Sequence, residues 1–207
     1  MKYVTLCLFL ILFAGNALAA ERELPTPQTD GGISVFQSLE TRASATGRDF
    51  PNGEISDEDL STLLWAASGR NRQGKGWIVP IAMGKAPYCT VYVAAADGSY
   101  LYDGKKHSLR KVNATSIKDT VGLQSFVGKA HYVLIFVINT EDTSKLDING
   151  AGEILTGAMT QNVYLAAQSL NIGVRYIVSL NEDAIRKNLH LKSTEKPVCI
   201  LPMGSYK

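Results

Sequence analysis

The pattern of apolar and polar residues along the chain predicts four helices, at residues 32–42, 56–69, 150–170 and 181–189. The second helix has the clearest pattern, because Leu60, Leu63 and Ala67 follow the spacing of one helix face. Ser56 precedes this pattern as an N-cap, and Gly69 follows it as a stop signal. These positions define the expected ends of that helix.

Shorter runs of apolar and β-branched residues predict strands at residues 89–95, 100–102, 131–138, 174–180 and 198–201. Asp97-Gly98 predicts a hairpin turn between the first two strands. The run from His131 to Ile138 is apolar throughout, which predicts a central strand that is buried on both faces. This order of elements indicates an α+β fold in which helices pack on a mostly antiparallel sheet.

The stretches between these elements are polar or rich in glycine and proline, at residues 43–53, 70–87, 104–128 and 139–149. We expect one short helix among them, near residues 118–127. The remaining positions of these stretches are expected to be loops. Loops of this kind are common places for binding residues.

The N-terminal residues have the pattern of an export signal. Lys2 supplies a positive charge, an apolar run continues to Phe13, and Ala17-Leu18-Ala19 is a small-residue cleavage site. We therefore expect residues 1–19 to be a signal peptide that is cut after Ala19, and the mature protein to be periplasmic or secreted. No later segment is long and apolar enough to be expected to span a membrane.

Composition and charge favour one globular domain. The chain has 207 residues, of which 45% are hydrophobic and 19% are charged, so it can bury a substantial core. The polar, proline-containing residues 20–31 predict a flexible leader, which is followed by a domain at 32–207. A net charge of +2 with scattered basic residues argues against a nucleic-acid-binding protein.

The sequence carries none of the usual catalytic or metal-binding patterns. Its three histidines lack the spacing of metal ligands, and it has no CxxC, GxSxG, GxGxxG or Walker motif. We expect no metal site. Export would allow a disulfide between Cys89 and Cys199, and the alternative is two buried thiols that act as small apolar residues.

Two guanidinium groups and a hydroxyl fall at the end of the first predicted helix and in the turn after it, from Arg42, Ser44 and Arg48. Arginine binds phosphate through two parallel hydrogen bonds, and a serine hydroxyl can donate to the same group. This set predicts a phosphate-binding site. A solvated surface turn is the alternative interpretation.

Two further features could hold a ligand. Asn162 falls in line with an apolar stripe of the long helix, where a ligand or a backbone group must satisfy its amide. The segment Leu64–Arg72 leads from a helix into a glycine-rich loop, where backbone groups can approach a ligand. A helix with an exposed basic end would explain that segment equally.

In this order, the features resemble the FMN-dependent nitroreductase family, in particular its bacterial, SagB-like branch with an LWAAxGxNR motif. Leu64–Arg72 matches that motif directly, and Gln161–Leu165 matches a QNVYL helix. Further similarity comes from the RxSxRxF-like element, the VYV…DG…LYD hairpin and the C-terminal end, at residues 42–50, 91–103 and 203–207. The resemblance covers about residues 33–207.

The resemblance implies a dimeric flavoprotein with FMN at the interface of a homodimer. Such proteins pass a hydride from a reductant to a small-molecule acceptor, for example a quinone or a nitroaromatic compound. By resemblance, Arg42 and Ser44 would hold the FMN phosphate, and Arg48 would lie near the pyrimidine edge of the flavin. The other implied cofactor-binding residues are Pro80, Ile81, Ala82, Asn162, Gly173, Arg175, Gly204 and Lys207.

One loop departs from the family pattern. Where the family has RTAPSA, this chain has Trp77-Ile78-Val79-Pro80-Ile81-Ala82. Apolar side chains here indicate either a pocket recast for an apolar acceptor or a family member that serves as a binding module without flavin turnover. A flavin enzyme of another reaction is a third hypothesis. Because nicotinamide nucleotides are cytosolic, an exported enzyme would use a redox protein or a quinol as its reductant.

Overall fold

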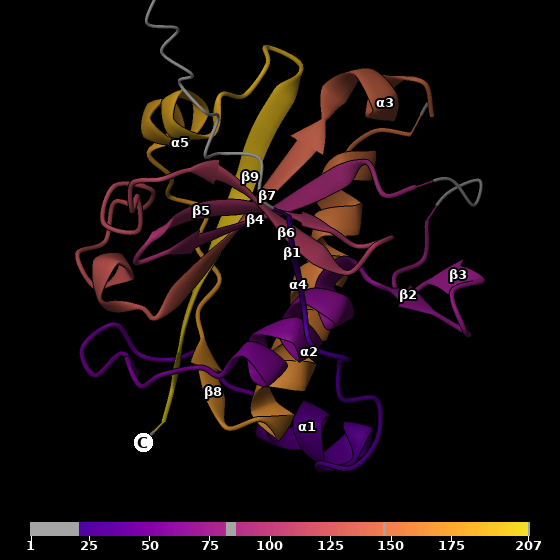
Figure 1. Cartoon of the computed structure of the whole chain (residues 1–207), viewed down its shortest axis with the longest axis vertical. Coiled ribbons are helices and arrows are strands. Elements are labelled where there is room, and N and C mark those ends of the chain that lie inside the picture. The colour runs from indigo at the N-terminus through magenta and orange to yellow at the C-terminus, as the bar shows by residue number, and fades with distance from the viewer. Residues whose placement is uncertain (1–20, 82–85, 147, 207) are drawn as a thin grey trace, which may run out of the picture.

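An antiparallel sheet forms the centre of the computed structural model, which describes residues 21–81, 86–146 and 148–206. The predicted signal peptide, residues 1–19, lies outside these ranges. The strands run across the sheet in the order β1 (Glu21–Glu23), β6 (Ser108–Asn113), β5 (Gly98–Asp103), β4 (Cys89–Ala95), β7 (Tyr132–Asn139), β9 (Glu195–Ser205) and β8 (Ile172–Val174). A separate small hairpin consists of β2 (Arg70–Asn71) and β3 (Gly76–Trp77). Figure 1 shows this hairpin projecting from the side of the sheet.

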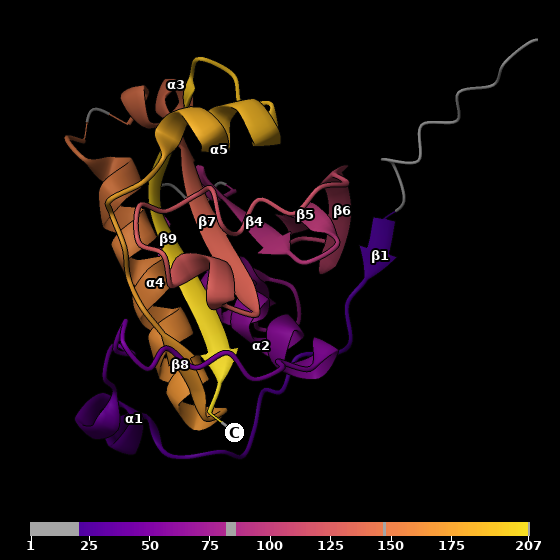
Figure 2. The ribbon, with the colours of Figure 1, turned by 90° about the vertical axis from the view of Figure 1, so that its left-hand side faces the viewer.

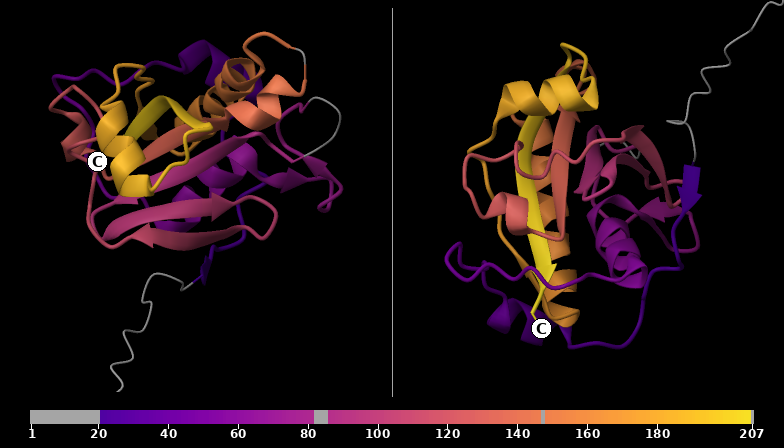
Figure 3. Two further views of the ribbon diagram at one scale, coloured as in Figure 1. Left: turned by 90° about the horizontal axis from the view of Figure 1, so that it is seen from above. Right: turned by 60° about the vertical axis from the view of Figure 1, so that its left-hand side comes forward.

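Helices and ordered loops cover both faces of the sheet. The helices in the described ranges are α1 (Val35–Thr41), α2 (Asp57–Ser68), α3 (Thr140–Ser144), α4 (Ala151–Ser169) and α5 (Glu182–Leu189), and η2 (Val127–Lys129) is a 3-10 turn. α2 and α4 pack on one face, while α5 and the segment before β7 pack on the other (Figure 3). The predicted α+β arrangement is therefore confirmed. No helix in the described part of the chain has the length and apolar character needed to cross a membrane.

The central strand β7 supplies apolar side chains to both faces. Leu134, Phe136 and Ile138 belong to the core under α2 and α4, whereas Val133 and Ile135 belong to the core under α5. All of these side chains are at most 2% exposed. Burial of one such side chain stabilises the fold by about 1.5–3 kcal/mol. The prediction of a strand buried on both faces is confirmed.

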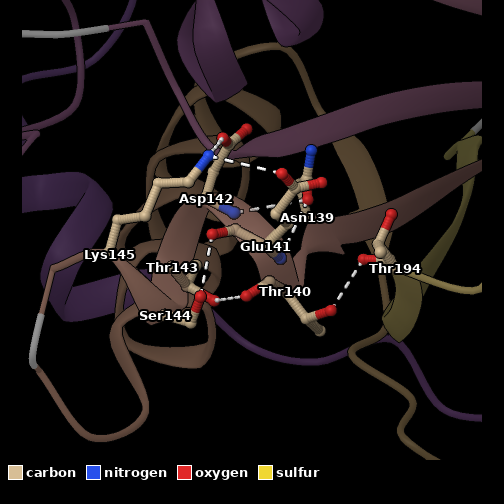
Figure 4. A network of polar contacts seen from close by, with 8 residues as sticks. All are labelled: Asn139, Thr140, Glu141, Asp142, Thr143, Ser144, Lys145 and Thr194. Carbon is tan, nitrogen blue, oxygen red and sulfur yellow. Dashed lines mark hydrogen bonds and ion pairs between the residues drawn. The ribbon is translucent and has the colours of Figure 1, made fainter.

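Polar caps fix where the helices begin. The Ser56 side chain accepts a hydrogen bond from the Asp59 backbone N–H, as the N-cap pattern predicted. Asn139, at the end of β7, caps α3 by accepting from the N–H groups of Glu141 and Asp142 (Figure 4). The Thr140 hydroxyl donates to the Thr194 carbonyl at 2.9 Å, which ties α3 to the start of β9.

Several expected elements differ from the structure. The helix expected near 118–127 is absent from this described stretch, where η2 is the one regular turn. β6 was not predicted because its sequence is polar; the strand buries Leu109 near its start. β9 extends beyond 198–201 in both directions: a bulge in its pairing with β7 accommodates Pro197, and its pairing with β8 continues to Ser205. Residues 175–180, expected as part of a strand, are joined to their neighbours by isolated bridges at Ile177 and Leu180.

The leader segment that we expected to be flexible contacts the domain at several points. β1 pairs with β6 at the edge of the sheet, and Leu24 after it is buried in the core. The Ser61 hydroxyl donates to the Pro25 carbonyl at 2.5 Å. The N–H of Ile33 donates to the Ser169 hydroxyl at 3.1 Å. These contacts hold residues 21–33 against α2, α4 and the sheet edge.

Cys89 and Cys199 are free thiols on the two strands that flank β7. Cys89 lies opposite Ile138 on β4, and Cys199 lies opposite Phe136 on β9. Burial raises the pKa of the Cys89 thiol to about 12 and raises that of Cys199 as well. The sequence left two alternatives open, a disulfide between these cysteines or two buried thiols, and the structure contains the buried thiols.

Candidate functional site

The C-terminal half of α4 organises the residues predicted to bind phosphate. The Tyr164 ring is buried, but its hydroxyl reaches the end of the helix layer. It accepts a hydrogen bond from the Tyr176 backbone N–H at 2.7 Å and lies 2.9 Å from the Ser44 hydroxyl. The Arg42 guanidinium lies over the same ring, 5.3 Å from its centroid. Tyr164 therefore holds the predicted cation and hydroxyl in one place.

Arg42 and Ser44 reach this place because α1 ends just before them. The Arg42 N–H donates to the Ser38 carbonyl and closes the helix at Thr41. Figure 2 shows α1 beside the C-terminal end of α4. Ser44 is exposed, and Arg42 has no carboxylate within ion-pair distance in the described structure. An uncompensated cation beside an exposed hydroxyl fits a phosphate group.

Arg175 holds the loop that follows Ser44. Its Nη1 donates to the Ala45 carbonyl at 3.0 Å, and its guanidinium lies over the Phe126 ring. Phe126 also stacks on Phe50 with a centroid distance of 5.2 Å. The exposed Arg48 lies between these two anchored points of the loop. The loop that carries Arg48 is therefore fixed at both ends by buried aromatic and backbone contacts.

Asn162 lies beside the buried stripe of α4, and not within it. The buried face includes Leu155 and Met159, as expected, but it continues through Val163 and Ala167, and not through Asn162 and Ala166. The expectation that Asn162 replaces a core residue is therefore wrong. Its half-buried amide makes no hydrogen bond to any residue in the described ranges.

Gly173 and Gly204 pair across β8 and β9 and pack against the segment that links the phosphate loop to α2. A Cβ on Gly204 would lie 2.0 Å from the Pro51 carbonyl oxygen, and a Cβ on Gly173 would lie 2.3 Å from the Pro51 ring. The backbones of Gly53 and Ser205 exchange two hydrogen bonds next to this contact. The two glycines thus allow residues 51–53 to approach β9 closely.

Pro80 and Ile81 lie elsewhere, in a pocket of about 420 Å³ that is also lined by Arg70, Arg72 and Trp77. The Arg70 guanidinium stacks on Trp77, with 4.6 Å to the ring centroid. In Figure 1, β2 and β3 project on one side, whereas the segment between α1 and α2 loops out on the other. One chain therefore does not bring the two predicted groups of residues into one site.

Ala82 and Lys207, two other predicted site residues, lie outside the described residues. Within the residues that are described, no group of three histidine, cysteine or acidic side chains is placed to hold a metal ion. Sequence reasoning did not single out Tyr164 or Tyr176 as site residues. For Tyr164 the signal was available, since it belongs to the motif at 161–165.

Comparison with known proteins relates the chain to one family. The model of the nitroreductase family matches residues 39–205. A nitroreductase-like protein of Methanocaldococcus jannaschii is 28% identical over 169 residues, which make up 76% of this chain and 84% of the relative.

Solved structures support the same relation. The crystal structure of a nitroreductase-like protein from Ralstonia eutropha JMP134 has a TM-score of 0.82 and 28% identity, covering 100% of this chain and 99% of that one. A nitroreductase family protein from Clostridium novyi NT has a TM-score of 0.60 at 17% identity, covering 84% and 86%. At that identity the likeness supports the fold alone.

The close packing of Gly204 can be tested by substitution. Gly204→Ala should destabilise the fold by about 1–3 kcal/mol, because the new methyl group overlaps the backbone of Pro51. Gly157→Ala in α4 is the matched control, since a Cβ there would meet no atom within 4 Å outside its own stretch of helix. The control should stabilise by about 0.5–1 kcal/mol. Urea denaturation measures both; an unchanged stability of Gly204→Ala would contradict the packing.

Proposed function

The chain belongs to the nitroreductase family of flavin-type oxidoreductases, and we propose that it binds FMN and reduces a quinone-like or nitroaromatic acceptor. The observation that carries the proposal is the cluster of Arg42, Ser44 and Tyr164 within the segment matched by the family. FMN supplies hydride transfer when it is bound, which accounts for the lack of a catalytic motif in the sequence.

The chemistry of this cluster fits the phosphate of FMN. A dianionic phosphate needs a cation and oriented donors, and Arg42 and Ser44 provide them. The buried Tyr164 ring keeps both groups in place, so little conformational entropy is lost when the phosphate binds. Asn162 on the same helix has a half-buried amide free to meet a polar edge of a ligand.

Arg48 and the loop at Trp77–Ile81 would serve the flavin ring. A cation near the pyrimidine edge stabilises the negative charge that reduction leaves there, and the exposed Arg48 can supply it. The side chains of Trp77 and Ile81 are apolar, and they would exclude water from an apolar acceptor. The family resemblance implies this role for Arg48, whereas the apolar side chains of the loop depart from the family pattern.

A homodimer would unite the two groups of residues. Within one chain the cluster around Tyr164 and the pocket at Pro80 and Ile81 are separate. A second copy could place its Pro80–Ile81 loop over the phosphate cluster of the first. Members of this family are usually dimers, and we propose the same for this chain.

An exposed apolar surface supports the dimer. On α1, Val35, Phe36 and Leu39 are 56%, 80% and 53% exposed. Helices of a soluble monomer rarely present so much apolar area to water. α1 also ends at Arg42, so a dimer formed through it would bring the partner next to the phosphate cluster.

The phosphate role predicts a specific loss of affinity. Arg42→Gln and Ser44→Ala should each raise the Kd for FMN about tenfold or more, because a hydrogen bond to a charged group contributes about 1.5–3 kcal/mol. The Kd for riboflavin, which lacks the phosphate, should not change. Quenching of flavin fluorescence measures both constants, and Arg22→Gln on the far edge strand is the control.

Equal losses for FMN and riboflavin would contradict the phosphate assignment. Protein that is colourless after purification and takes up no FMN on reconstitution would overturn the proposed function. The apolar loop at Trp77–Ile81 would then favour the second candidate, a binding module without flavin turnover.

The dimer can be tested at its most exposed apolar side chain. Phe36→Asp should convert a dimer to a monomer, because two charges would be buried at the interface. Leu123→Asp is the control, since Leu123 is 69% exposed but precedes η2 and is remote in sequence from α1. Light scattering coupled to size-exclusion chromatography gives the mass. A wild-type protein that elutes as a monomer would refute the proposal.

We further propose export, on the pattern of residues 1–19. Expressed in a bacterium, the protein should be found in the periplasm or medium, and its N-terminal sequence should begin at Ala20. A cytoplasmic protein that retains Met1 would contradict this. An exported enzyme would take electrons from a redox protein or a quinol.

A further inference from the structure

A pocket of about 800 Å³ lies on the side of the domain where the leader segment crosses the end of α2. Its walls come from four parts of the chain: the leader, the end of α2, the β2–β3 hairpin and the loop 104–107. This volume is within the range of pockets that take small organic molecules. None of the residues predicted to bind flavin lines it.

The pocket is strongly cationic. Arg70, Arg72, Lys105 and Lys106 line it, and Glu23 is the one acidic side chain among the described lining residues. Lys106 forms an ion pair with Glu21 at 3.1 Å. In the described ranges, neither Arg72 nor Lys105 has a carboxylate within ion-pair distance. Arg70 forms no ion pair in these ranges either, so three of the four lining cations remain uncompensated.

The apolar part of the lining contains an aromatic ring. It consists of Leu24, Pro27 and Trp65. The Trp65 Nε1–H donates to the Arg70 carbonyl at 2.7 Å, which fixes the orientation of the indole. A fixed indole beside a proline ring is a good surface for a planar aromatic group.

The cationic wall is also held rigidly. Arg72, Gln73 and His107 have φ angles of 49°, 56° and 57°, and they are three of the five non-glycine residues with positive φ in the described structure. Such conformations persist where surrounding contacts enforce them, often at ligand sites. Here the His107 ring lies 2.7 Å from the Ser61 hydroxyl and 2.9 Å from the Tyr102 hydroxyl. The loop that carries Lys105 is thereby fixed before any ligand arrives.

We propose that this pocket binds an aromatic molecule that carries an anionic group, with the ring against Trp65 and Pro27 and the anion at Arg72 and Lys105. The proposal goes beyond the proposed function and does not depend on bound flavin. Arg70 and Arg72 also line the pocket that contains Pro80 and Ile81. An occupant would therefore contact the hairpin that separates the two pockets.

The test uses 2-naphthoate as the probe and the neutral 2-naphthamide as its matched comparison. Titration calorimetry of the full-length protein with saturating FMN should give a Kd for 2-naphthoate at least tenfold lower than for 2-naphthamide. The double variant Arg72→Gln, Lys105→Gln should raise the Kd of 2-naphthoate at least tenfold. Lys75→Gln is the control, because Lys75 lines the pocket at Pro80 and Ile81 but not this one.

Fluorescence gives a second readout, because the chain has two tryptophans and they line different pockets. Quenching by 2-naphthoate should persist in Trp77→Phe and disappear in Trp65→Phe. The proposal is overturned if 2-naphthamide binds as tightly, if Lys75→Gln weakens binding as much as the double variant, or if no binding occurs at millimolar probe. Visible absorbance reports flavin content separately, so failure of flavin binding is distinguished from failure at this pocket.

Discussion

The alternation of side chains along β7 is the constraint on which the rest of the structure depends. A strand with apolar residues on both sides must be covered on both faces, since exposed apolar area costs about 25 cal/mol per Å². α2 and α4 cover Leu134 and Phe136, while α5 and the segment before β7 cover Val133 and Ile135. The two-layered core follows from this one strand, and the other strands extend its edges.

The phosphate cluster is a consequence of how α4 covers that strand. The last turns of the helix lie beside α1 and lead into β8, the edge strand of the sheet. Tyr164 lies in these turns, with its ring in the core and its hydroxyl at the edge. Ser44 and Arg42 therefore take their positions from a residue that the core itself fixes, and the site gains rigidity without a dedicated scaffold.

Local sequence patterns were sufficient to predict much of the fold, but they predicted less of the candidate site. The N-cap at Ser56 and the apolar run of β7 are encoded by neighbouring residues, and both predictions were correct. β6 and the length of β9 depend on pairing with distant strands, which a local pattern does not contain. The prediction that Asn162 lies in the core was wrong. A small rotation of a helix about its own axis is enough to bury the neighbouring side chain in its place. The role of Tyr164 was missed because its hydroxyl contacts Ser44 and Tyr176, which a local pattern does not reveal.

The cationic pocket depends on the leader segment, residues 21–33. Most of the contacts that hold this segment against the domain are weak individually. β1 has three residues, and the ion pairs Arg22–Asp57 and Lys106–Glu21 are at the surface, where water and salt screen them and each contributes little to stability. The burial of Leu24 and the hydrogen bond from Ser61 to Pro25 are the contacts protected from water. Because these same residues adjoin the pocket wall, whatever strengthens the docking of the leader also shapes the pocket. The pocket and the folded leader are therefore one cooperative feature of the domain.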